Sequence, residues 1–309
     1  MENQTHSKCL FFLAFFNHGE KLPLLSIVFF LIYVIGILGN LIITMVIYLD
    51  SHLHTPMYFF LCSLAFVDIC YPTVTLPKLM DILLSGNDSI TCIQCFTQMY
   101  FFLTLAAVEA ILLSSMAYDR YVAICKPLRY HLIMNRRVCV LVTIGTWVSG
   151  FVNSAFLTFL ASKFLICGSN KIKQFFCDIK AVADISCDRT AFYGAIYVEA
   201  FFFGFTTFSL NVISYINIIQ NIIHIKSKHS RQKAFSTCTS HFTVLIIFYG
   251  SGLWTYLRPP SESNQKLDSV FTVLLVGVTP MLNPLIYSLR NKEVKNALIR
   301  IVRKKSSCP

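Results

Sequence analysis

Long apolar runs separated by short polar segments constrain the fold of this chain more than any other feature. The chain has 309 residues, of which 55% are hydrophobic and only 13% are charged. A soluble domain of this length cannot bury so much apolar surface, and runs of roughly 20–27 residues match the helix length that a bilayer core of ~30 Å requires. The sequence therefore predicts an all-α membrane protein, a seven-transmembrane helix bundle that forms one domain over residues 1–309. The predicted spans are approximately 24–49, 57–81, 93–121, 138–161, 194–223, 235–257 and 267–289.

Basic residues between the predicted spans indicate how the bundle is oriented. Of the 26 Lys and Arg residues, 16 fall on the side of Arg120: five in 119–137, four in 224–234 and seven in 290–309. Cytoplasmic loops carry such an excess, so we expect an extracellular N-terminal tail (1–23) and a cytoplasmic C-terminal tail. Because the net charge of +11 lies between apolar runs rather than along one face, it indicates membrane topology and not nucleic-acid binding.

Two further features accord with this orientation. Glycosylation sequons begin at Asn3 and Asn87, in segments that we expect outside the cell. At the other end, apolar residues recur among Lys and Arg over 292–305. This pattern predicts a short amphipathic cytoplasmic helix, the eighth of the chain, that lies on the anionic inner leaflet of the membrane.

Four strings of residues resemble the signatures of one receptor family. They are LHTPMYFFL (Leu53–Leu61), MAYDRYVAICKPLRY (Met116–Tyr130), KAFSTCTSH (Lys233–His241) and PMLNPLIYSLRN (Pro280–Asn291). They occur in the order and spacing of the olfactory receptors, a branch of the rhodopsin-like G-protein-coupled receptors, and they extend along nearly the whole chain. The chain therefore resembles an olfactory receptor.

Span 3 places three notable residues on one face. Glu109 precedes Arg120 by 11 residues, which is three helical turns plus about 20°, and lies roughly 16 Å deeper. Phe102 precedes Arg120 by 18 residues, five full turns, and lies roughly 27 Å away. This stripe favours a helix that transmits a signal towards the cytoplasmic Arg, although an ordinary buried face with a charged end has the same spacing.

Two acids, Asp68 and Glu109, fall at matching depths near the middle of the predicted membrane. Two carboxylates this deep cannot both stay ionised without compensation, so either one takes up a proton or a cation lies between them. The family resemblance implies a sodium site here, with Asn283 as a polar partner. A protonated, purely structural pair is the alternative.

Cysteines on the predicted outer side suggest disulfides, because lumenal cysteines of a secretory-pathway protein can pair. By resemblance, Cys95 pairs with Cys177 and Cys167 pairs with Cys187. Cys92 lies three residues before Cys95 and is an alternative partner for Cys177.

The resemblance places a ligand cavity among spans 3, 5, 6 and 7. Its mostly apolar lining favours small hydrophobic ligands. Aminergic receptors have an Asp at the Phe102 position, so its absence argues against an amine bound in that mode. An amine or another basic ligand that binds to Glu199 stays possible. Alternatively, this carboxylate reaches water or an Arg of the outer loops. The lining residues that we expect are Phe102, Leu103, Ala106, Ala107, Glu199, Phe203, Tyr249, Leu253, Tyr256, and Thr272 or Val276.

The resemblance also implies a conformational switch at the cytoplasmic end. Asp119 and Arg120 would form a latch in the inactive state, and Tyr215 and Tyr287 would meet Arg120 in the active state. Pro284 removes a backbone hydrogen bond and kinks span 7, which suits an element with two packings. The residues expected in coupling and switching are Asp119, Arg120, Tyr121, Tyr215, Asn283, Pro284 and Tyr287.

Other functional classes lack support in the sequence. It has no Gly-rich phosphate loop, nucleophile elbow or metal-spaced Cys/His set, so we expect neither an enzyme nor a cofactor beyond the sodium ion. A channel or transporter would need a polar pore stripe or repeated halves, and the sequence shows neither feature. The resemblance implies an odorant receptor in the plasma membrane of olfactory cilia, which couples to the olfactory stimulatory G protein and raises cyclic AMP. A rhodopsin-like receptor for a non-odorant metabolite or peptide outside the olfactory epithelium, or a chain that no longer signals, would share these motifs.

Overall fold

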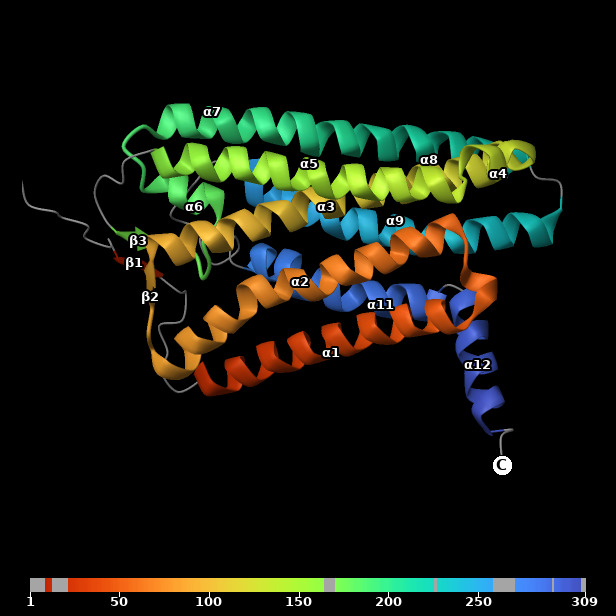
Figure 1. Cartoon of the computed structure of the whole chain (residues 1–309), viewed down its shortest axis with the longest axis horizontal. Helices are drawn as coiled ribbons and strands as arrows, with labels where there is room; N and C mark the ends of the chain where they lie inside the picture. The colour runs from red at the N-terminus through yellow and green to blue at the C-terminus, as the bar shows by residue number, and fades with distance from the viewer. Residues whose placement is uncertain are drawn as a thin grey trace, which may run out of the picture.

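The computed structural model of the chain is a bundle of long helices (Figure 1). It describes residues 9–12, 22–163, 170–224, 227–257, 270–290 and 292–306. Within these residues, six helices are long and apolar enough to cross a membrane: Pro23–Leu49, Pro56–Ser85, Cys92–Cys125, Arg136–Lys163, Arg189–His224 and Val270–Tyr287. The remaining predicted span lies within the more polar α9 (Lys228–Leu257), a helix of 30 residues. The predicted all-α seven-helix bundle is thereby confirmed.

Residues that are typical of helix caps and first turns mark the ends of α2 and the start of α3. After α1 (Leu22–Leu49), α2 (Pro56–Ser85) begins with a proline, which fits the first turn because it lacks only an amide that has no helical partner. It ends at Gly86, whose φ of 71° suits a residue without a Cβ. α3 (Cys92–Cys125) starts with a capping box, in which Thr91 Oγ1 accepts from the Gln94 amide and Gln94 Oε1 accepts from the Thr91 amide. α5 (Arg136–Lys163) follows the short α4 (Tyr130–Ile133).

Spans 5 and 7 each contain a π-helical segment. Span 5 consists of α7 (Arg189–Glu199), the π-helical residues Ala200–Phe205 and α8 (Thr206–His224). Span 7 passes from π-helical Leu274–Val278 into α11 (Thr279–Arg290). A π-helical turn holds more residues than an α-helical one, so the residues on either side of it no longer follow one 3.6-residue phase.

α3 is the central helix of the bundle and the most buried of the candidate spans. It contacts α2, α5, α8 and α9, while α1 contacts α2 and α11. Two glycines allow close approach. A Cβ at Gly150 of α5 would lie 2.8 Å from Val108 Cγ2, and one at Gly39 of α1 would lie 2.9 Å from Pro284 Cγ. The helices could not pack at these distances with larger residues.

A three-stranded sheet lies at one end of the bundle, here called the sheet end (Figure 1). β1 (Cys9–Phe12) lies between β2 (Ser89–Thr91), to which it is antiparallel, and β3 (Lys171–Ile172), to which it is parallel. Leu10 and Phe12 are buried. The apolar residues after Cys9 are too few to span a membrane, and the structure shows that they close one end of the bundle instead.

The opposite end, here called the α12 end, carries the predicted amphipathic helix, α12 (Lys292–Ser306) (Figure 1). Its apolar residues Val294 and Ala297 are fully buried. Arg300 donates to Asp50 Oδ2, at 2.9 Å from Nε and 2.5 Å from Nη2, which ties α12 to the connection between α1 and α2. Burial raises the pKa of Asp50, but hydrogen bonds from Arg300 and His52 outweigh it and hold that pKa at about 2. Asp50 is therefore ionised at neutral pH.

Candidate functional site

A cavity of about 490 Å³ lies between α3, span 5 and α9, towards the sheet end. Its walls are mainly aromatic and aliphatic side chains, which matches the usual character of small-molecule sites. The residues that line it are Tyr71, Leu103, Ala106, Ala110, Ile179, Ile196, Tyr197, Glu199, Ala200, Phe201, Gly204, Phe205, Phe208, Phe248, Tyr249, Gly252, Leu253, Tyr256 and Leu275.

Hydrogen bonds beneath the cavity join three helices at Tyr249. The Tyr249 hydroxyl donates to Thr207 Oγ1 of α8 (2.9 Å) and accepts from Asn211 Nδ2 (3.1 Å). Asn211 Nδ2 also donates to Ser114 Oγ of α3 (2.9 Å), and Ser114 donates to the Thr207 carbonyl (3.2 Å). A ligand that moves Tyr249 would therefore disturb contacts between α3, α8 and α9.

The loop segment α6 (Ile179–Asp184) covers the cavity at the sheet end, with Ile179 in the cavity wall. The buried Asp178 just before it accepts a hydrogen bond from the Tyr256 hydroxyl (2.9 Å). Lys180 Nζ donates to the Thr255 carbonyl of α9 (2.7 Å). Burial raises the pKa of Asp178 to about 6, although Tyr256 and Lys180 act in the opposite direction. The covering segment is thus bonded directly to α9.

Glu199 lies in the cavity wall at the end of α7. Asn153 Nδ2 of α5 donates to Glu199 Oε1 at 3.3 Å. Within the residues that the structure describes, no basic side chain forms an ion pair with Glu199.

Deeper in the bundle, Asp68 and Asn283 are buried together. Asn283 Nδ2 lies 3.0 Å from each carboxylate oxygen of Asp68. Glu109 is also buried and close enough to Asp68 for charge repulsion. Glu109 Oε1 and Asn283 Oδ1 are buried atoms to which the described residues donate no hydrogen bond. Unpaired oxygens beside a carboxylate are the donor type that a hard cation such as Na⁺ accepts.

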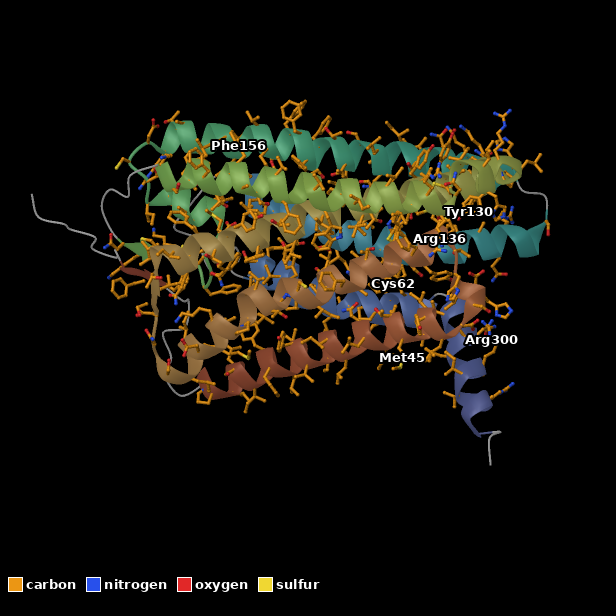
Figure 2. The ribbon with its side chains drawn as sticks, viewed as in Figure 1. Met45, Cys62, Tyr130, Arg136, Phe156 and Arg300 are labelled. Atoms are coloured by element: carbon orange, nitrogen blue, oxygen red, sulfur yellow. A yellow bond between two sulfur atoms is a disulfide. The ribbon has the colours of Figure 1, made fainter. Side chains whose placement is uncertain are left out.

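At the α12 end, Asp119 is buried and accepts a hydrogen bond from the Tyr130 hydroxyl of α4 (2.8 Å). Figure 2 shows Tyr130 at this end of the bundle, near Arg136. Burial, followed by the nearby Asp119 carboxylate, raises the pKa of Tyr130 above its ordinary value, so the hydroxyl remains a donor. Among the described residues no ion pair joins Asp119 to Arg120. Neighbouring helix residues point about 100° apart. Instead of the expected latch between Asp119 and Arg120, the structure has the hydrogen bond between Tyr130 and Asp119.

Arg120 faces the helices on the other side of α3. It is half-buried and lies within electrostatic reach of Tyr215, His241 and Tyr287. Tyr215 shares a hydrogen bond with His241 Nδ1 (2.9 Å) and donates to the Cys238 carbonyl (3.1 Å). Arg120 Nε and the Tyr287 hydroxyl are buried without a hydrogen-bond partner among the described residues. In this conformation Arg120 and Tyr287 lie within electrostatic reach of each other, yet no hydrogen bond joins them.

Comparisons with known proteins decide the family. The family model described as "Olfactory receptor" matches residues 29–305. The chain is 45% identical to human olfactory receptor 8H1 over 300 residues, which cover 96% of this chain and 95% of that protein. It is 44% identical to mouse olfactory receptor 5B21 over 287 residues, covering 92% and 89%, and 42% identical to human olfactory receptor 13F1 over 301 residues, covering 97% and 94%. The chain belongs to the olfactory receptor family. It is therefore a membrane-embedded receptor and not an enzyme.

Several residues predicted to line the cavity of this olfactory receptor do so in the structure. They are Leu103, Ala106, Glu199, Tyr249, Leu253 and Tyr256. The prediction missed Ile179 of α6 and much of the π-helical part of span 5, including Phe205. Helical periodicity could not identify these residues of span 5, because the residues on either side of a π-helical segment do not follow one 3.6-residue phase.

Other residues expected in the lining lie beside the cavity. Phe102 packs between Tyr71 and Phe176, with ring centroids 5.1 and 4.7 Å apart. Thr272 Oγ1 lies 3.0 Å from Gln174 Nε2, which donates to it. The remaining positions are Ala107 and Val276, which are buried, and Phe203, whose carbonyl accepts a hydrogen bond from Thr207.

The remaining predicted sites of this receptor are the disulfides, the glycosylation sites and Tyr121. The structure contains the disulfide between Cys95 and Cys177, so Cys92 does not take Cys177. Cys187 is disulfide-bonded, while its expected partner Cys167 lies outside the described residues. Asn87 is exposed, as a glycosylation site must be, and Asn3 lies outside the described residues. Tyr121, at the α12 end, has the Lys126 ammonium 5.4 Å from its ring centroid.

Proposed function

We propose that this olfactory receptor binds a small, mostly hydrophobic odorant in the cavity between α3, span 5 and α9, and that binding activates the olfactory stimulatory G protein and raises cyclic AMP. The observation that carries this proposal is the position of Tyr249. It lies in the cavity wall and is hydrogen-bonded to Thr207 and Asn211. An odorant can favour one conformation only through a difference in affinity, and contact with Tyr249 provides that difference.

Transmission follows the helices that meet at Tyr249. α3 continues from Ser114 to Arg120, and α9 runs from Tyr249 back to His241, which is bonded to Tyr215 of α8. A change in the packing of α9 against α3 and α8 thus reaches the unpaired groups around Arg120. We infer that these groups rearrange to admit the G protein at the α12 end, which is the cytoplasmic side. The N-terminus is then extracellular in the plasma membrane of olfactory cilia.

The first prediction concerns the size of the cavity. Gly252 lines it, and a Cβ at this position would meet no heavy atom within 4 Å. We expect Gly252→Leu to fill part of the cavity without a clash in the free receptor. Overfilling an occupied site costs roughly 1–3 kcal/mol, so the EC50 for odorants in a cyclic AMP assay should rise by about 5- to 150-fold.

Gly250 provides the matched control for this experiment. It lies on the same helix, is exposed, does not line the cavity, and would also leave a Cβ with no heavy atom within 4 Å. Gly250→Leu should leave the EC50 within about threefold, below the effect that 1 kcal/mol would have. Equal behaviour of the two variants, at equal surface expression, would place the odorant elsewhere.

We also propose that Asp68 and Glu109 hold a sodium ion, with Asn283 beside them. The unpaired Glu109 Oε1 and Asn283 Oδ1 support this proposal. The positive charge would offset two carboxylates that repel each other in a buried site. Bound Na⁺ would thereby stabilise the conformation that the structure shows.

Replacing choline chloride with sodium chloride should therefore raise the thermal midpoint of the purified receptor. The expected gain is about 1–3 kcal/mol of unfolding free energy when Na⁺ is present at ~10–100 times its Kd. Glu109→Gln should remove the gain, whereas Asp81→Asn, which changes an exposed acid of α2, should retain it. A gain of the same size in the Glu109 variant would show that Na⁺ acts at another place, and no gain in the wild type would favour a protonated, structural pair.

A further inference from the structure

Among the residues that the structure describes, Glu199 is the one acidic side chain in the wall of the cavity. The other polar groups of the wall include tyrosine hydroxyls that already have partners. The Tyr256 hydroxyl donates to Asp178 and the Tyr249 hydroxyl donates to Thr207, each at 2.9 Å. Within the described part of the chain, the cavity thus offers a ligand one carboxylate among largely apolar walls.

The partners of Glu199 within the protein do not satisfy it. A carboxylate has two oxygens and about four acceptor positions, whereas Glu199 accepts one hydrogen bond from the described residues, the 3.3 Å contact from Asn153 Nδ2. That distance is long for an N–H···O bond. No ion pair joins Glu199 to a basic side chain of the described residues. A partly buried carboxylate without a cation is costly, and a cationic ligand would remove that cost.

The cavity beside Glu199 can accommodate the apolar part of a ligand. Glu199 is followed by the π-helical segment, which contributes Phe201, Gly204 and Phe205 to the wall, and α9 contributes Gly252 opposite. A Cβ at Gly204 or Gly252 would have no heavy atom within 4 Å, so both glycines leave open volume. Aromatic rings on one side also attract a cation, which strengthens the choice of a charged ligand.

We propose that Glu199 is the anchor for a protonated amine, and that this receptor prefers small hydrophobic amines to neutral or acidic ligands of the same carbon skeleton. This inference rests on the proposed role of the cavity as the odorant site. It differs from an amine bound to span 3, because the Phe102 position holds no acid and the carboxylate here comes from span 5 instead.

The test compares matched ligands on the intact receptor. The probes are 2-phenylethylamine, 2-phenylethanol and phenylacetic acid, with cyclohexylamine and cyclohexanol as a second pair. Each is measured by its shift of the thermal midpoint of the purified receptor and by cyclic AMP in cells. The amines should bind most tightly and the acid least, because the acid would place two carboxylates together. Thermal shift reports binding even in a receptor that does not signal.

Glu199→Gln should weaken binding of the amines by about 10- to 100-fold, because it removes a charge-assisted hydrogen bond. The alcohols should change by less than about threefold, because Gln retains the shape and can still accept from Asn153. Asp188→Asn is the matched control. Asp188 is the N-cap of α7 and lies outside the cavity wall, and Asn caps a helix as well as Asp does. Both ligand classes should bind this control as they bind the wild type.

The outcomes separate this inference from the proposed function. Suppose that Gly252→Leu weakens the binding of every ligand. If Glu199→Gln then weakens amines and alcohols equally, or changes the binding of neither, the cavity is the site but Glu199 is not an anchor for amines. A loss confined to 2-phenylethanol and cyclohexanol would show that Glu199 serves as a hydrogen-bonding partner for neutral ligands, which also overturns the inference. If Gly252→Leu leaves the affinity of every ligand unchanged, the proposed site itself fails.

Discussion

Replacing Arg120 with Ala is expected to abolish the cyclic AMP response while the receptor still reaches the cell surface. The structure explains why these two effects should separate. Arg120 Nε has no hydrogen-bond partner, and no ion pair joins Arg120 to Asp119 among the described residues. Asp119 is held by Tyr130 instead. Removing the guanidinium therefore breaks no hydrogen bond or ion pair of the described residues, and we expect the folded state to remain stable enough to reach the cell surface.

We expect the signalling state to depend on the guanidinium of Arg120. Arg120 is within electrostatic reach of Tyr215 and Tyr287, and the Tyr287 hydroxyl has no hydrogen-bond partner among the described residues. A conformation in which these groups pair, or in which Arg120 meets the G protein, gains interactions that the present one lacks. Ala cannot supply them, so the balance between the two states should shift far from activation.

Arg136→Ala provides the control for this prediction. Arg136 is exposed at the first residue of α5, near Tyr130 at the same end of the bundle (Figure 2). This variant should keep most of the response, and surface staining should be alike in both variants. An unchanged response in the Arg120 variant at normal surface expression would contradict the role of Arg120 in transmission.

The length and apolar composition of the runs were sufficient to predict the membrane-spanning helices, because the bilayer imposes both on each span. The positions of the helix ends were predicted less accurately. α2 continues four residues past its predicted end and stops only at Gly86, where the positive φ favours glycine. The strand Cys9–Phe12 could not be foreseen, because its pairing with β2 and β3 depends on two loops that are distant in the sequence.

The candidate site was predictable only where a regular helix carries it. Leu103 and Ala106 of α3 lie where the family pattern places them. Phe102 is on the expected face of α3, yet Phe176 of the loop packs against its ring, and no helical period describes a loop. In span 5 the π-helical segment changes the phase of the residues that reach the cavity. The acid Glu199 could be recognised from the sequence, but its place in the wall required the fold.

The second large effect is expected at the disulfide that ties α3 to the covering loop. Cys95–Cys177 closes a loop across 82 residues of sequence, and such a closure contributes about 4–5 kcal/mol by restricting the unfolded chain. That is a large part of the stability of a typical domain. Cys177 is also adjacent to Asp178, which the Tyr256 hydroxyl bonds to α9. Losing the disulfide would therefore loosen the segment that covers the cavity.

We expect Cys95→Ser and Cys177→Ser each to reduce surface delivery to background levels, because a destabilised membrane protein is retained and degraded. The double variant should be no worse than either single one, since all three lack the same bond. Cys62→Ser, at a half-buried free thiol of α2, should reach the surface normally. Flow cytometry of unpermeabilised cells, using an N-terminal epitope, measures all four. Delivery that survives either single substitution would show that α3 and the loop around Cys177 are held by their packing and by the hydrogen bond that the Cys177 amide donates to Gln98 Oε1, rather than by the disulfide.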